Sequence, residues 1–178
     1  MQTIELATTQ AKAIELKVEP LTHEAFAPFG DVIEASDSVH HFTINAGNTE
    51  RYHDLANVDV GADGKAIVSI FRGQPRELPF TVAMMERHPK GSQAFIPMSG
   101  RPYLVVVADK NSKPTAGDLR CFLAQPGQGV NYAKGVWHHP LLALYETSDF
   151  LVVDRSGPGG NCDEVGLDER GVINKLFL

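Results

Sequence analysis

Apolar and polar residues alternate along several short stretches of this chain, and a period of two indicates strands that bury one face. Other short stretches are almost wholly apolar, as in fully buried strands. The predicted strands include 14–18, 31–34, 66–71, 103–107, 118–124, 141–145 and 150–154. Glycine- and proline-rich turns separate them at short intervals, which is typical of an antiparallel barrel or sandwich. The alternation of strands and helices that a parallel α/β fold needs is absent.

The sequence predicts few helices. Thr22 is a candidate N-cap for a short helix at 24–26, which Pro28 and Gly30 end. The only other candidate is 163–176, where Gly166 and Gly171 lower helix propensity. We expect residues 1–13 to form a disordered lead and 14–178 to form a single domain.

The stretch 84–107 carries the clearest candidate chemistry. Glu86 and His88 are two residues apart, so on a strand their side chains share a face. A Pro-Lys-Gly turn follows, and Gln93 begins the next predicted strand. The hairpin can therefore bring these three side chains to one point, as a small metal or acid–base site requires.

Two spacings in the chain resemble the motifs of the cupin superfamily. The first is Glu86-x-His88-x4-Gln93-x6-Gly100, and the second is Gly127-x5-Ala133-x-Gly135-x2-His138. The resemblance implies an all-β, cupin-like (bicupin-type) antiparallel β-barrel with a few short helices. It also places Glu86, His88, Gln93 and His138 at the positions of metal ligands.

Imidazole and carboxylate groups suit first-row divalent metals, whereas the Gln93 amide is a weak, neutral ligand. The alternative is that Glu86 and His88 are solvent-facing residues at a strand end. Neighbouring strand residues face opposite sides, so only one of His138 and His139 should point inward. The spacing selects His138, and we expect His139 to be structural.

A second polar cluster, 50–55, contains Arg51 and Tyr52. Arginine can bind a substrate carboxylate through two parallel hydrogen bonds. The alternative is that these polar residues form a cluster of ion pairs on the surface. We assign substrate binding to Arg51, Tyr52, Gln93, Tyr132 and Lys134.

Charge and composition exclude some roles. The formal net charge is −6, which disfavours nucleic acid or an anionic membrane as the main partner. No apolar run approaches a membrane span, and the N-terminus lacks the pattern of a signal peptide. Two cysteines are too few for a disulfide framework and favour a reducing compartment. We therefore expect a cytoplasmic protein.

Longer strings resemble the ureidoglycolate lyase family: 50–55 (ERYHDL), 86–89 (ERHP), 93–98 (QAFIPM), 129–132 (GVNY), 136–141 (VWHHPL) and 161–163 (NCD). The resemblance implies a cupin-type barrel, a homodimer, and cleavage of (S)-ureidoglycolate to glyoxylate and urea during allantoin and purine degradation. It also implies a divalent metal such as nickel and no organic cofactor.

That reaction needs a base for the carbinol proton and an acid for the departing urea nitrogen, roles that His88, His138 and Glu86 can fill. Two other readings stay open at this point. One is a different metal-dependent cupin enzyme, an isomerase or a dioxygenase. The other is a cupin that binds a small molecule without catalysis.

Overall fold

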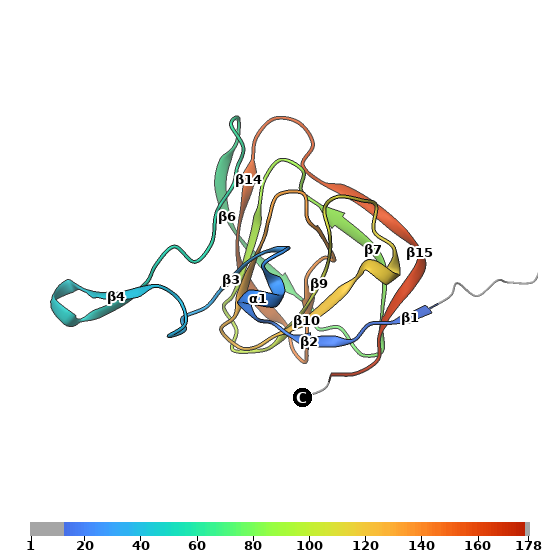
Figure 1. Cartoon of the computed structure of the whole chain (residues 1–178), viewed down its shortest axis with the longest axis horizontal. Coiled ribbons are helices and arrows are strands. Elements are labelled where there is room, and N and C mark those ends of the chain that lie inside the picture. Colours follow the sequence, from blue (N-terminus) through green and yellow to red (C-terminus); the bar gives the residue numbers. More distant parts are fainter. Residues whose placement is uncertain (1–12, 177–178) are drawn as a thin grey trace, which may run out of the picture.

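The computed structural model describes residues 13–176, most of which lie in or between short strands (Figure 1). Within residues 13–176 there is one α-helix, α1 (His23–Phe26), and there are two 3-10 turns, η1 (Asn45–Gly47) and η2 (Ala116–Asp118). The strands are β1 (Ala13–Glu15), β2 (Val18–Pro20), β3 (Gly30–Ile33), β4 (His41–Ile44), β5 (Thr49–Tyr52), β6 (Lys65–Gly73), β7 (Phe80–Arg87), β8 (Gln93–Pro97), β9 (Tyr103–Ala108), β10 (Arg120–Ala124), β11 (Gly129–Tyr132), β12 (Trp137–His138), β13 (Leu142–Ala143), β14 (Ser148–Ser156) and β15 (Asp163–Ile173).

Two sheets form the barrel. One has the order β1-β15-β7-β12-β9-β10-β2, with β13 also paired to β9, and the other has the order β3-β11-β8-β14-β6. Every pairing in them is antiparallel except β1 with β15 and β10 with β2, at the two ends of the first sheet. The predicted all-β, cupin-like fold is confirmed.

The core follows the alternation of the strands. Aromatic rings fill the space between the sheets, with Phe95 and Tyr132 in edge-on contact and Tyr103 edge-on to Phe150. Leu104 and Val106, on the other face of β9, belong to a second buried cluster that includes Met85 and Trp137. Most of the buried side chains in the described part of the chain are therefore apolar, and the buried polar ones include His138 on β12 and Gln93 on β8.

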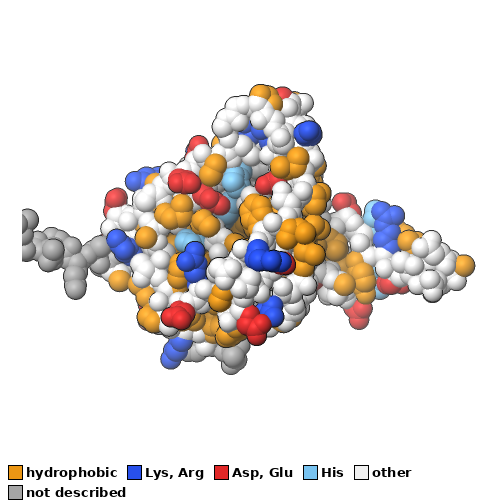
Figure 2. All heavy atoms as spheres, turned by 180° about the vertical axis from the view of Figure 1, so that it is seen from behind, with side chains coloured by type: hydrophobic (Ala, Val, Ile, Leu, Met, Phe, Trp, Pro, Cys, Tyr) orange, Lys and Arg blue, Asp and Glu red, His pale blue; other side chains and the backbone are white. Residues whose placement is uncertain are grey.

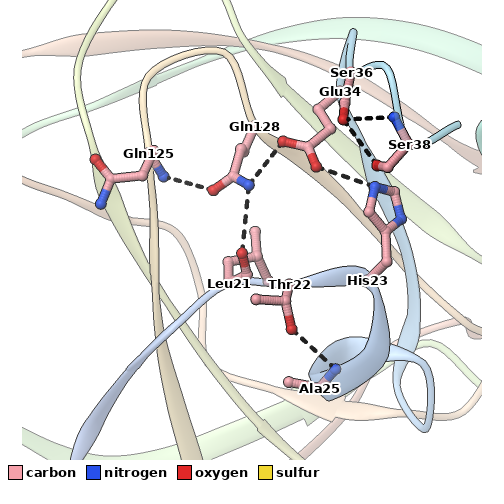
Figure 3. Close-up of polar contacts among 9 residues, drawn as sticks. All are labelled: Leu21, Thr22, His23, Ala25, Glu34, Ser36, Ser38, Gln125 and Gln128. Atoms are coloured by element: carbon pink, nitrogen blue, oxygen red, sulfur yellow. Dashed lines mark hydrogen bonds and ion pairs between the residues drawn. The ribbon is translucent and has the colours of Figure 1, made fainter.

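The predicted short helix is present as α1, and the Thr22 hydroxyl accepts a hydrogen bond from the backbone N–H of Ala25. Next to α1, the side-chain amide of Gln128 donates hydrogen bonds to the backbone carbonyl of Leu21 and to the carboxylate of Glu34 (Figure 3). These bonds connect three segments at this end of the barrel.

The expected late helix at 163–176 is wrong. Asp163–Ile173 form β15, which pairs with β7 on both sides of an irregularity between Gly166 and Gly171, and residues 174–176 follow it without regular structure. The two glycines that weakened the helix flank this interruption, and pairing with a distant strand decided the structure. Of the expected disordered lead 1–13, residues 1–12 lie outside the described part of the chain, and Ala13 begins β1.

One element stands apart from the barrel. Strands β4 and β5 pair only with each other and form a hairpin that projects from the side of the molecule (Figure 1).

Candidate active site

Glu86, His88 and His138 meet at one end of the barrel. Glu86 lies near the end of β7, directly opposite His138 on β12, and His88 follows β7. One ligand atom from each of the three lies within 4.8 Å of the others, and the two imidazole centroids are 5.1 Å apart. Figure 2 shows histidine side chains in a hollow with acidic side chains beside it.

His138 is almost fully buried, with 1% of its surface exposed. Its Nδ1 lies 3.1 Å from the carbonyl oxygen of Val136, and because a carbonyl only accepts, Nδ1 carries the hydrogen. The lone pair of a neutral His138 is therefore on Nε2, which is 3.4 Å from Oε1 of Glu86. The other side of the ring stacks on Tyr132.

His88 has the same arrangement of its ring nitrogens. Nδ1 lies 2.6 Å from the carbonyl oxygen of Asn161, and Nε2 lies 3.1 Å from Oε1 of Gln93. Asp154 orients the Gln93 amide, because Oδ2 of Asp154 accepts a hydrogen bond from Nε2 of Gln93 at 3.4 Å. Both nitrogens of His88 thus face oxygen acceptors, a setting that a ring protonated on both sides satisfies.

The protonation of His138 and Glu86 follows from burial and from their contact. Burial lowers the pKa of His138, and the neighbouring Glu86 carboxylate opposes this only in part. Burial acts to raise the pKa of Glu86, but His138, His88 and His139 outweigh it and the pKa ends below its ordinary value. At neutral pH the pair is therefore a carboxylate beside a neutral imidazole.

This donor set fits a divalent cation. Both histidines use Nδ1 to contact backbone carbonyls, so Nε2 is the nitrogen that each ring can offer to a cation. At His88, the cation would replace the contact between Nε2 and Oε1 of Gln93. Gln93 could add an amide oxygen. The predicted ligands Glu86, His88, Gln93 and His138 are thus brought together.

The family comparison bears on this site. A family model described as ureidoglycolate lyase matches residues 13–174. The chain belongs to the ureidoglycolate lyase family. It is 60% identical over 156 residues to a ureidoglycolate lyase of Burkholderia cepacia, covering 86% of each chain. It is 58% identical over 150 residues to one of Pseudomonas entomophila (strain L48), covering 84% of this chain and 89% of the relative.

In this member of the ureidoglycolate lyase family, the residues assigned to substrate binding are spread over three places. Gln93 and Tyr132 contact the two histidines. Lys134 pairs with Asp59 at 3.0 Å and lines a separate polar cavity of about 410 Å³. Arg51 and Tyr52 are on the projecting β4–β5 hairpin.

His139 packs edge-on against Phe80, with Nδ1 directed at the carbonyl of Pro140.

Sequence reasoning missed three residues of the site. Neighbouring strand residues face opposite sides, and on β14 Asp154 contacts Gln93, whereas Arg155 bonds to Asp63 at 2.7 Å. Alternation along β14 could have shown this. Cys162 and Glu164 lie with Glu86 in a second group of potential ligand atoms, also within 4.8 Å of one another.

Proposed function

We propose that this chain cleaves (S)-ureidoglycolate to glyoxylate and urea. Membership of the ureidoglycolate lyase family supports the substrate, and the Glu86–His138 pair supports the chemistry. The bond that breaks joins the carbinol carbon to the ureido nitrogen. The hydroxyl loses its proton and becomes the aldehyde of glyoxylate, while the nitrogen gains a proton and leaves as urea.

His138 is the proposed base. Its pKa is lowered, so the ring is neutral at physiological pH, and Nδ1 is held by Val136, so the lone pair is on Nε2. Glu86, at 3.4 Å from this nitrogen, stabilises the imidazolium that forms when His138 takes the carbinol proton.

His88 is the proposed acid. Acceptors flank both of its ring nitrogens, so the protonated ring is well placed to give its Nε2 proton to the departing nitrogen. Gln93, held by Asp154, then contacts the ring on the side from which the proton leaves. One base and one acid so placed supply the two proton transfers that the reaction needs.

Glu86, His88 and His138, with Gln93 as a weaker neighbour, are also the residues that would hold a divalent metal such as nickel. Such an ion supplies Lewis-acid polarisation of the hydroxyl oxygen. Metal binding needs a free Nε2 lone pair on each histidine, whereas the proton transfers need Nε2 free on His138 and protonated on His88. The two uses therefore belong to different states of the site, and we propose a metal that assists activity without being indispensable.

The proposal extends to the setting of the enzyme. We propose a homodimer in the cytoplasm that takes a small anionic substrate from allantoin and purine degradation. No helix in residues 13–176 is long and apolar enough to cross a membrane.

The test is to incubate the purified protein with racemic ureidoglycolate and to assay glyoxylate, urea and ammonia, before and after chelation. We expect glyoxylate and urea in equal amounts, with a His138→Ala variant as the negative control. Release of ammonia in place of urea, or no glyoxylate from the wild-type protein, would refute the proposed activity.

A further inference from the structure

The β4–β5 hairpin has no packing partner among the residues that the structure describes. Its strands, joined by η1, pair only with each other. A two-stranded hairpin alone is marginally stable in water. This one nevertheless has an ordered set of side chains: Glu50 accepts from Thr43 at 2.7 Å and lies 2.6 Å from Nδ1 of His41. A hairpin built in this way and projected from the barrel suits contact with another molecule.

The hairpin carries an arginine that pairs with no acidic group of the described residues. Arg51 is exposed, its guanidinium carbon is 5.8 Å from the centre of the Phe42 ring, and it forms no ion pair within residues 13–176. Phe42 is itself 37% exposed. Arginine and an aromatic ring together are typical of the residues that dominate protein interfaces.

The barrel site lacks such a cation. Among the described residues, no arginine bonds to Glu86, His88 or His138. The nearest in sequence, Arg87, is paired with Asp163 at 2.9 Å and lies over the Trp137 ring. The surrounding groups at Glu86, Asp154 and Glu164 are acidic. Besides His88 and a bound metal, the described residues at the site therefore provide no arginine that could hold a substrate carboxylate through two parallel hydrogen bonds.

A surface for a second copy is present on β6. This strand is an end of its sheet, and Val68 and Ile70 on its outer face are 67% and 60% exposed. Exposed apolar side chains beside an unpaired strand edge mark an interaction surface. The β4–β5 hairpin projects outward from the side of its own barrel (Figure 1).

We infer that two copies pack through the β6 surface and that each hairpin reaches the other copy's barrel, where Arg51 binds the substrate carboxylate. This rests on the proposed function for the identity of the substrate. The acidic rim of one barrel and the exposed arginine of the other hairpin are complementary in charge. Each active site is then completed by two chains.

Mixed dimers test the shared site. Arg51→Ala should raise KM about tenfold or more, as loss of a charge-assisted hydrogen-bonded pair does, and His138→Ala should abolish turnover. A mixed dimer with one chain of each, isolated with two tags, should show the wild-type KM and about half of the wild-type kcat, because one of its two sites is complete. Arg101→Ala is the matched control and should leave KM unchanged. A mixed dimer that keeps the raised KM of Arg51→Ala, or an Arg51→Ala enzyme with unchanged KM, overturns the inference.

Two further measurements do not depend on activity, so they separate this inference from the proposed function. In Arg51→Cys, a short bismaleimide should link residue 51 to the exposed Cys162 of the other copy, giving a covalent dimer that Cys162→Ser removes. Val68→Asp should convert a dimer to a monomer in sedimentation velocity, whereas Asn111→Asp, which adds the same charge elsewhere, should not. A monomeric wild-type protein, or linkage within one chain only, contradicts the shared site even if glyoxylate is formed.

Discussion

The imidazole of His138 and the phenol of Tyr132 lie face to face, with ring centroids 4.1 Å apart and planes inclined by 8°. This stacking fixes the plane of the proposed base, while the Val136 carbonyl fixes its tautomer. The base is therefore held rigidly before the substrate arrives.

Replacing Tyr132 tests whether the stacking matters for catalysis. Tyr132→Leu should reduce stability by about 0.5–1.5 kcal/mol beyond the loss of buried area, and it should lower kcat because the His138 ring can tilt. Tyr132→Phe keeps the ring face and should preserve most of kcat. Urea denaturation and steady-state kinetics of the two variants distinguish them, and equal kcat in both would show that the stacking is only structural.

The adjacent histidines should behave differently on substitution. His138→Ala and His88→Ala remove the proposed base and acid, so each should lower kcat by about 10²–10⁴-fold. His139→Ala should leave kcat close to that of wild type and lower the melting temperature, because His139 packs against Phe80 away from the reacting groups. Full activity in either of the first two variants would remove that histidine from the mechanism.

The pH dependence has a predicted sign. His138 has a lowered pKa in the folded protein, so the unfolded chain binds more protons as pH falls below the ordinary histidine value of 6.5. Stability should therefore fall from about pH 6.5 down to the folded pKa. His138→Gln should flatten this part of the curve of unfolding free energy against pH.

The same group should set the acid side of the activity profile. Glu86 raises the pKa of His138, so Glu86→Gln should move the acid limb of kcat/KM to lower pH, as well as reduce the maximal rate. A shift to higher pH, or no shift, would mean that another group titrates there.

Metal removal should reduce the rate without abolishing it, because both proton-transfer groups belong to the chain. Glu86→Ala should lose metal content measured by mass spectrometry, whereas Asp63→Ala, an acidic residue outside the cluster, should retain it. A chelated enzyme that is entirely inactive and recovers only with metal would contradict this expectation.

Local pattern was sufficient for much of the structure. The Thr22 cap determines α1, and the period-two placement of Glu86 and His88 brings them together with His138 on the neighbouring strand. The sequence was misleading where distant pairing decides: β15 is a strand because it pairs with β7. Gly166 and Gly171 mark the register irregularity between them, but they do not show which strand β15 pairs with. The role that we infer for Arg51 was not predictable for a related reason. It depends on how two copies of the chain pack together, and the sequence of one chain does not show this.

Pairing of β15 with β7 also means that the site depends on the last part of the chain. The backbone carbonyl of Asn161 holds the hydrogen on Nδ1 of His88, although Asn161 lies 73 positions later in the chain. β15 begins shortly after Asn161, at Asp163. A chain from which this segment has been cut loses the carbonyl that holds the hydrogen on Nδ1 of His88, and it also loses the strand that pairs with Glu86. During synthesis, catalytic competence is then acquired last, so a truncated product is an inert protein rather than a weak enzyme.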